Sequence, residues 1–325
     1  MAKHTRGWLI LGAILTVIGL GMFAAAMAAQ SWNFAELDTQ DYQTNTYTMQ
    51  EPFRSIAMDT ETADIGLALS SNSDCTVVCY APENTTHTVA VENGVLTVRS
   101  VDDRKWYDHI GIYSETPKIT VYLPGTAYGA LTLKGHTGAV EIPKDFHFET
   151  IDISTDTGIA VLLASVSDTA RVQTATGTIR AENISVGNLY LSTDTGKISV
   201  TGLHCTGDLY LDVSTGRTEL TAVRCRSLYS DGNTGRITLT DVIAEEALSI
   251  KRDTGDVKLE HCDAADIFIE TDTGHVTGSF LSPKIFTVEA DTGSIKVPDS
   301  VTGGICRIST DTGDIAITLD DIPSQ

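Results

Sequence analysis

The stretch LYLSTDTGKISV, residues 189–200, decides how this chain folds. Apolar and polar residues alternate on both sides of Thr195-Gly196, a pattern typical of two short strands that each bury one face. The Thr-Gly pair recurs ten times at intervals of 19 or 20 residues. Its glycines are Gly138, Gly158, Gly177, Gly196, Gly216, Gly235, Gly255, Gly274, Gly293 and Gly313. A fixed period of this length is the signature of stacked structural repeats.

The positions of the apolar residues within each repeat predict which side chains face inward. Counted from the glycine, positions −7, −5, +2 and +4 are mostly apolar, as in Leu189, Leu191, Ile198 and Val200. A third inward site is expected at position +7, occupied by Ile184, Leu203, Val223, Val242, Cys262 and Leu281.

A single repeat cannot fold alone. Ordering about 20 residues costs roughly 20 to 40 kcal/mol, whereas burial of five mid-sized apolar side chains returns only about 8 to 15 kcal/mol. Neighbouring repeats must supply the difference by stacking about 4.8 Å apart. The sequence therefore predicts an all-β fold, a single-stranded β-solenoid (β-helix or β-roll) with coils of 19–20 residues, preceded by one transmembrane helix.

The segments before the first Thr-Gly predict a start and a cap for the solenoid. Residues 51–70 resemble an outlying coil, with Ile56, Met58, Ile65 and Leu67 at the inward positions. Thr88–Val98 predicts a hairpin, and Lys118–Leu123 predicts a further strand. The expected domains are a cytoplasmic stub (1–7), a transmembrane anchor (8–29), a tether (30–50), a β cap with the first coil (51–130), the solenoid (131–319) and a tail (320–325).

An uncharged apolar segment from Trp8 to Ala29 is long enough to cross a bilayer. Lys3 and Arg6 precede it, and acidic residues follow it, so the positive-inside rule puts the amino terminus in the cytoplasm and the remainder outside. The alternative is a signal peptide cleaved after Ala28. The length of the apolar run favours the anchor, because it exceeds the usual core of a signal peptide.

Composition excludes several classes of function. With 42% apolar and 20% charged residues, the chain is too hydrophobic to be disordered. Its net charge of −21 opposes binding to nucleic acid. The six cysteines are few for a disulfide-dependent scaffold, and none has zinc-site spacing, so we expect no metal site and no cofactor. Cys205 and Cys225 occupy equivalent positions of adjacent coils, so either a disulfide or two buried thiols fits the pattern.

The order of these motifs carries a resemblance to a known family. The series Ile56-x-Met58, Ile65-x-Leu67, Gly94-Val-Leu96-Thr-Val98 and Ile119 to Pro124, followed by Asp-Thr-Gly coils, resembles the putative-adhesin family of bacterial β-strand-repeat surface proteins, a domain of unknown function. The resemblance covers about residues 51–319. It implies a β-solenoid on a membrane anchor and brings no catalytic residues.

The Asp-Thr-Gly motif is also the signature of aspartic proteases, which bring two copies together across a twofold axis. A solenoid instead stacks its copies side by side, so we expect a structural role in which Asp accepts a backbone N–H two residues further on and Gly adopts a positive φ. Four successive coils are expected to align Asp253, Asp272, Asp291 and Asp311. Calcium could lie between these carboxylates, although the Gly-rich nonapeptide of calcium-binding β-rolls is absent.

Three features of the expected outer surface are candidate binding elements. Tyr190, Tyr210 and Tyr229 occupy position −6 on three consecutive coils, and Lys197, Arg217 and Arg236 occupy position +1 on the same coils. Aromatic and cationic groups suit sugars or an anionic glycopolymer of the cell envelope, whereas the structural alternative is support of the outer sheet face. In a charged loop, Trp106 and Tyr107 are expected either to contact a partner or to cover the solenoid edge.

These features favour a non-enzymatic, membrane-anchored, adhesin-like or surface-presentation protein that binds an envelope glycan or another surface protein. One alternative is an envelope-stress accessory protein, which the short cytoplasmic stub opposes. Another is a β-helix carbohydrate-active enzyme, which rests on analogy of fold alone and lacks convergent carboxylates.

Overall fold

The computed structural model describes residues 2–29, 41–102 and 115–320. The first element is helix α1 (Ala2–Ala29). Its segment Gly7–Ala29 is long and apolar enough to cross a membrane, as expected from the sequence. The strands, in chain order, are β1 (Tyr42–Met49), β2 (Ser55–Thr62), β3 (Asp64–Leu69), β4 (Cys75–Pro82), β5 (Thr85–Glu92), β6 (Val95–Asp102), β7 (Lys118–Leu123), β8 (Ala127–Ile142), β9 (His147–Leu162), β10 (Ser165–Glu182), β11 (Ser185–Cys205), β12 (Asp208–Asp231), β13 (Ile237–Thr254), β14 (Val257–Cys262), β15 (Asp266–Thr273), β16 (Val276–Phe280), β17 (Lys284–Thr292), β18 (Ile295–Lys296), β19 (Gly304–Thr312) and β20 (Ile315–Leu319).

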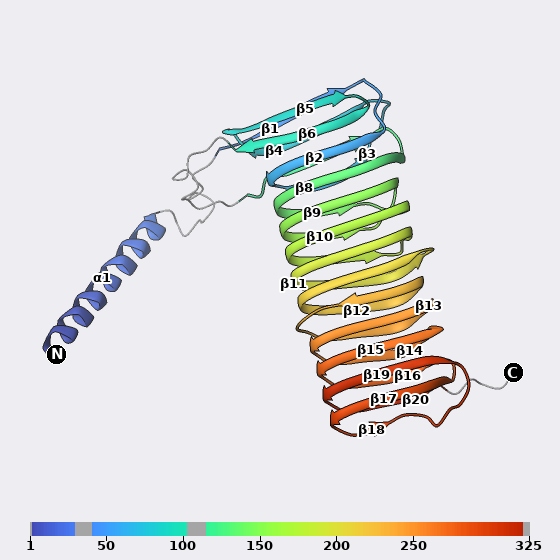
Figure 1. The fold of residues 1–325 in the computed structure, drawn as a ribbon. Coiled ribbons are helices and arrows are strands. Elements are labelled where there is room, and N and C mark those ends of the chain that lie inside the picture. Colours follow the sequence, from blue (N-terminus) through green and yellow to red (C-terminus); the bar gives the residue numbers. More distant parts are fainter. Residues whose placement is uncertain (1, 30–40, 103–114, 321–325) are drawn as a thin grey trace.

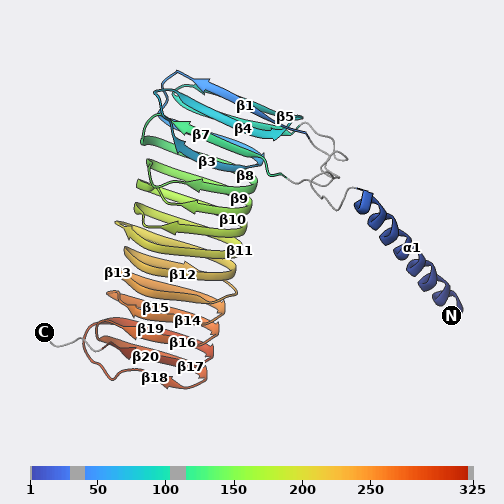
Figure 2. The same cartoon turned by 180° about the vertical axis from the view of Figure 1, so that it is seen from behind.

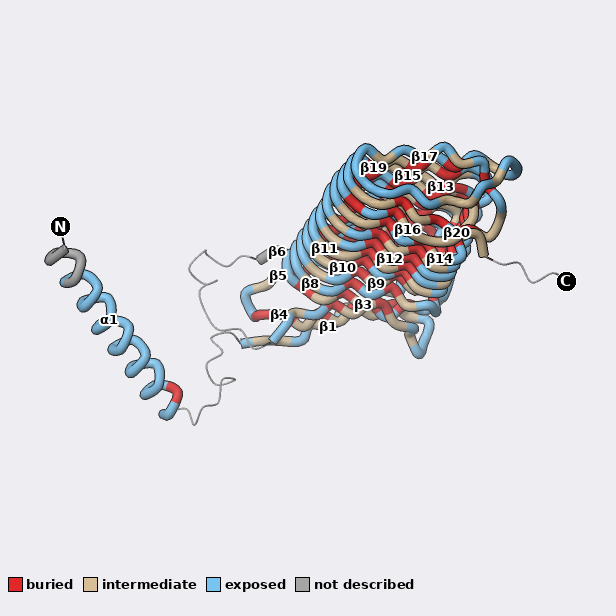
Figure 3. Tube along the Cα trace, turned by 90° about the horizontal axis from the view of Figure 1, so that it is seen from below, coloured by how far each residue is buried: buried red, intermediate tan, exposed pale blue. Residues whose placement is uncertain are grey.

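The strands from β8 onward stack as parallel coils into a rod (Figure 1). Equivalent residues of adjacent coils lie opposite one another, so that Leu189 faces Leu209 and Gly196 faces Gly216. Buried residues, red in Figure 3, recur in coil after coil along the rod, and their side chains form one continuous core. The predicted β-solenoid is confirmed.

The Thr-Gly pair is a bend within a long strand, where the sequence suggested a turn between two short ones. In β8 to β12 the chain stays extended through this pair. In nine of the ten Thr-Gly pairs, the φ angle of the glycine lies between 138° at Gly235 and 157° at Gly177, a region that side chains disfavour. A Cβ placed on Gly216 would lie 1.7 Å from the carbonyl oxygen of Gly196. Glycine is therefore required because the backbones of adjacent coils approach one another so closely.

The predicted capping role of the Asp-Thr-Gly carboxylates is wrong for the described coils. None of these aspartates accepts a hydrogen bond from its own turn. Asp156 instead contacts the coil beneath it, where its Oδ2 lies 2.8 Å from Nδ1 of His136. The bend comes from the glycine, and the aspartates are exposed.

The layers do not follow chain order at either end of the rod. β19 and β20 lie between the β15–β16 coil and the β17–β18 coil, so β17–β18 forms the last layer. At the other end, β2 pairs with both β6 and β8. The predicted alignment of Asp253, Asp272, Asp291 and Asp311 in chain order is therefore wrong. The coil of Asp311 lies between those of Asp272 and Asp291. Every coil offers the same strand edges, so the repeat itself does not specify which coil stacks next.

The third inward site is confirmed for five of the six expected residues. Ile184, Leu203, Val223, Val242 and Cys262 are each at most 2% exposed. The prediction that Leu281 faces inward is wrong. A register shift after Leu259 places Phe280 opposite Cys262, and Phe280 is fully buried.

The start of the solenoid and its cap match the sequence except for one strand. Residues 51–70 form a coil whose Ile56 and Met58 lie opposite Leu131 and Leu133. The β5–β6 hairpin turns at Asn93 and Gly94, which both have positive φ. Residues 42–49, expected within the tether, instead form β1, which pairs with β4 at the cap.

Replacement of Gly216 by Ala tests the close approach of the coils. The new Cβ would overlap the backbone of Gly196, so we expect Gly216→Ala to lower the free energy of unfolding by more than about 3 kcal/mol. Gly66→Ala is the matched control, because a Cβ at Gly66 meets nothing within 4 Å. Thermal unfolding of both variants checks this, and equal melting temperatures would contradict it.

Candidate binding surface

The three tyrosines at position −6 form a stacked ladder on the outer face of one sheet. The ring centroids of Tyr190 and Tyr210 lie 4.7 Å apart with planes 3° from parallel, and those of Tyr210 and Tyr229 lie 5.0 Å apart at 14°. The distance between coils sets this spacing, which also suits aromatic stacking. The ladder is thus a direct consequence of the repeat register.

Stacking covers the ring faces and leaves the ring edges and hydroxyl groups outward. Tyr210 has a tyrosine on either side, and the guanidinium of Arg171 lies 5.0 Å from the ring centroid of Tyr190. The coil beyond Tyr229 carries Ser249 at the same position. A sugar could therefore stack flat only on the outer face of Tyr229, and elsewhere it would meet ring edges.

A groove of about 250 Å³ runs beside this ladder. Its walls combine the tyrosines with hydrogen-bonding side chains from the same strands. These polar residues are Arg171, Gln173, Ser192, Asp212 and Asp231. The formal charges give one cation and two anions, so the groove suits a neutral, hydroxyl-rich ligand better than an anionic one.

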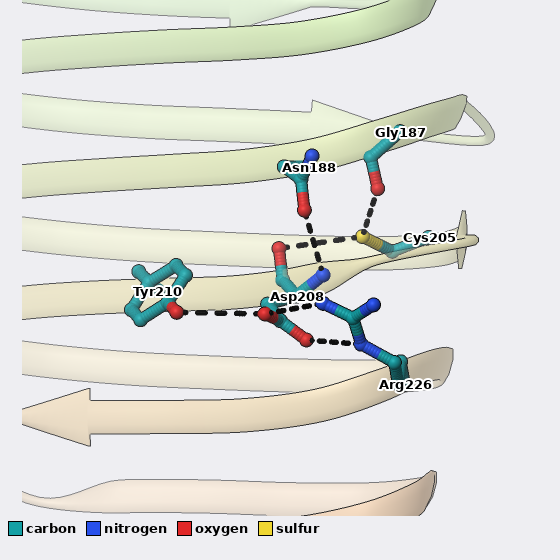
Figure 4. Close-up of polar contacts among 6 residues, drawn as sticks. All are labelled: Gly187, Asn188, Cys205, Asp208, Tyr210 and Arg226. Atoms are coloured by element: carbon teal, nitrogen blue, oxygen red, sulfur yellow. Dashed lines mark hydrogen bonds and ion pairs between the residues drawn. The ribbon is translucent and has the colours of Figure 1, made fainter.

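An ion pair lies next to the ladder and contacts the hydroxyl of Tyr210 (Figure 4). Arg226 donates two hydrogen bonds to the carboxylate of Asp208, from Nε to Oδ1 at 2.9 Å and from the terminal nitrogen to Oδ2 at 2.7 Å. The hydroxyl of Tyr210 donates to Asp208 Oδ2 at 3.5 Å, and Asn188 accepts the Asp208 backbone N–H at 3.1 Å. The hydrogen bond from Arg226 holds the pKa of Asp208 below its usual range. Sequence analysis missed this pair, although opposite charges 18 residues apart in a 19-residue repeat could have indicated it.

The basic ladder lies beside a different groove from that of the tyrosines. Arg217 and Arg236 line a hollow of about 670 Å³ that shares no lining residue with the tyrosine groove. Lys197 pairs with Glu219 of the next coil at 2.6 Å, and Arg236 pairs with Asp256 at 2.9 Å. These carboxylates compensate two of the three cations. The structure therefore does not bring the tyrosine and basic ladders together.

Trp106 and Tyr107 lie outside the described residues. Among the residues that are described, no three His, Cys, Asp or Glu side chains lie close enough to hold a metal ion.

A hollow of about 770 Å³, larger than the two grooves described above, lies near the first coils and was not indicated by the sequence. Its floor includes Tyr128 and Phe148, whose ring centroids are 5.9 Å apart. Both rings are at most 9% exposed. They serve mainly to pack the core beneath the groove.

The six cysteines are buried thiols in this structure. Cys205 donates to the carbonyl oxygens of Gly187 and Asp208, at 3.2 and 3.5 Å. Burial raises the pKa of Cys225 and of Cys306 to about 12. Such thiols remain protonated near neutral pH and are poor nucleophiles.

A family model described as Toastrack DUF4097 matches residues 53–212 and, separately, residues 211–322. The chain belongs to the Toastrack DUF4097 family. This membership confirms the resemblance seen in the order of the sequence motifs. The two matches cover the whole solenoid of this Toastrack chain and its cap except for β1. No curated protein matches it significantly.

Solved structures similar to the Toastrack chain include two proteins of Parabacteroides distasonis and one of Bacteroides fragilis. A putative adhesin from Parabacteroides distasonis ATCC 8503 is 12% identical, with a TM-score of 0.48 over 86% of this chain and 98% of that one. A putative lipid binding protein from the same organism is 14% identical, with a TM-score of 0.43 over 86% and 98%. A putative adhesin from Bacteroides fragilis NCTC 9343 is 15% identical, with a TM-score of 0.39 over 86% and 99%.

Replacement of Asp208 by Asn tests the ion pair with Arg226. We expect Asp208→Asn to destabilise the fold near neutral pH by about 1 kcal/mol, since Arg226 stays half exposed. A carboxyl with a lowered pKa in the folded state contributes stability above its unfolded pKa and loses it as the pH falls through the folded pKa. The difference between variant and parent should therefore vanish on acidification, as measured by urea unfolding. Asp152→Asn is the control, because this exposed carboxylate makes no ion pair or side-chain hydrogen bond with the described residues. A pH-independent difference for Asp208→Asn would contradict the assignment.

Thiol titration distinguishes the two states of Cys205 and Cys225. We expect the folded chain to react slowly with iodoacetamide at about pH 8, because burial keeps the thiols protonated. After unfolding in denaturant without reductant, all six cysteines should be alkylated. Mass spectrometry counts the adducts, and a count of four with an intact Cys205–Cys225 peptide pair would show a disulfide instead.

Proposed function

We propose that this chain is a non-enzymatic, membrane-anchored surface protein that binds a neutral envelope glycan along the tyrosine groove. In this arrangement α1 spans the membrane, its amino-terminal end lies in the cytoplasm and the solenoid lies outside. The charges on either side of the apolar segment support this orientation.

The observation that carries the proposal is the groove beside Tyr190, Tyr210 and Tyr229. Its polar side chains repeat from coil to coil about 4.8 Å apart. A polymer of similar units can therefore make repeated weak contacts along the rod, and such contacts sum through multivalency. Sugar hydroxyl groups suit Gln173, Asp212 and Asp231, which offer both donors and acceptors.

The charges of the groove select among glycans. Asp212 and Asp231 repel a phosphate-bearing or uronic polymer, and the basic ladder that would attract one lies beside a separate groove. We therefore favour neutral hexose or hexosamine polymers over the anionic glycopolymers that the sequence also allowed.

A glycan binding screen with the full chain in nanodiscs tests this function. We expect neutral oligosaccharides to bind the parent, and a variant with Tyr190→Ser, Tyr210→Ser and Tyr229→Ser to lose at least about ten-fold in affinity. The matched control carries Lys197→Ser, Arg217→Ser and Arg236→Ser and should bind as the parent does.

Both variants must retain the circular dichroism and melting behaviour of a folded solenoid. Binding of neutral glycans that survives the tyrosine changes would remove the ladder from the site. Binding of anionic polymers that only the basic-ladder variant loses would transfer recognition to the other groove.

A further inference from the structure

The last layer of the rod ends in an open edge. β17 pairs along one side with β19, and β18 pairs along one side with β20. Within the described part of the chain, no strand pairs with the opposite sides of β17 and β18. Figures 1 and 2 show this layer at the end of the rod farthest from β1 and β5.

The apolar interior is incompletely covered at this end. Phe286, Val288 and Ala290 of β17 point toward the core but remain half-buried. Equivalent residues inside the rod, such as Leu248 and Ile250, are fully buried. At the cap end the outermost strands β1 and β5 likewise have half-buried inward residues, such as Met49 and Val91, so β17 is distinguished by its sequence. An edge with unpaired backbone groups and an exposed core is a template for another strand.

The sequence of β17 suits pairing with a second copy of itself. A twofold axis through Val288 places the nine residues Lys284–Thr292 of two copies in full antiparallel overlap. Inward Phe286 then lies opposite Ala290, and Val288 lies opposite Val288. The outward residues also match, because Ile285 faces Asp291 and Thr287 faces Glu289.

This register opposes no like charges. Glu289 and Asp291 would repel each other if they met, but each faces an uncharged residue of the other copy. The two acidic residues therefore oppose registers shifted toward Thr292, in which they would meet each other, and registers shifted toward Lys284 lose overlap between the two strands. Because a twofold contact closes on itself, the assembly stops at two copies.

We infer that two copies of this chain join tail to tail through β17, each completing the open coil of the other. The chain enters the solenoid through β1 at the cap end, so the paired rods carry their amino-terminal anchors at opposite ends. If the helices are anchored as in the proposed function, on which this step rests, the dimer links two facing membranes. The protein then acts as a homophilic adhesin.

Charge changes at Thr287 test the register. The full chain in detergent micelles is studied by sedimentation velocity from about 1 to 100 µM. We expect a monomer–dimer equilibrium. Thr287→Lys places a cation opposite Glu289 twice per dimer and should tighten the dimer about 5-fold, whereas Thr287→Glu should weaken it about 5-fold. Both effects should shrink at about 1 M salt.

Ser154→Lys, at an exposed position of β9 several coils away from β17, is the control and should leave the dimer constant unchanged. A parent that stays monomeric across the range would overturn the inference. So would shifts of the two Thr287 variants in the same direction.

Reconstituted vesicles separate this inference from the proposed anchoring. Clustering of vesicles by the parent, strengthened by Thr287→Lys and weakened by Thr287→Glu, is the expected result in light scattering. A dimer in detergent without vesicle clustering would support the tail contact and overturn the link between membranes. The variant with the three tyrosine changes should form the dimer as the parent does, even if it no longer binds glycan, because the ladder lies in the middle of the rod.

Discussion

Close contact between glycine backbones at successive coils is the constraint on which this structure depends. A Cβ on Gly158, Gly177, Gly196, Gly216 or Gly235 would lie 1.5 to 1.9 Å from the carbonyl oxygen of the glycine beneath it. With glycine there, the strand bends without leaving the hydrogen-bonded ladder, and equivalent residues stay in line from coil to coil. The long strands β8 to β12, and the core that they enclose, follow from this bend.

The same alignment converts single residues into ladders on the outside. A tyrosine repeated at one position becomes a stack of rings at 4.7 and 5.0 Å, and opposite charges on neighbouring coils become ion pairs such as Lys197–Glu219. Ladders of this kind stabilise the sheet face and at the same time form a repeated surface. The two roles compete in the tyrosine ladder, because the ring faces used for stacking are withdrawn from any ligand. Recognition is then left to ring edges, hydroxyl groups and the polar walls of the groove.

The ends of the rod follow different rules from its middle. At the cap, β1 and the β5–β6 hairpin cover the core with antiparallel strands. At the far end the chain passes β17 and β18, then returns to place β19 and β20 beneath them. This inserted coil connects the last layer to the rod, because β19 and β20 pair with β17 and β18 on one side and with β15 and β16 on the other. The free edge of β17 carries acidic side chains on its outer face and apolar side chains on its inner face.

Sequence alone determined the period, the inward positions and the first coil, because these depend on local alternation and on a glycine that recurs at a fixed interval. It also predicted the β5–β6 hairpin from Asn93-Gly94, and the alignment of the three tyrosines from the register. Tertiary structure decided the order of the outer layers, the burial of Phe280 in place of Leu281, and the Asp208–Arg226 pair. It also separated the tyrosine and basic grooves. The physical reason is that every coil presents the same backbone edges. Periodicity therefore specifies which positions repeat. The choice of neighbouring coil and the direction of each side chain depend on contacts between distant segments.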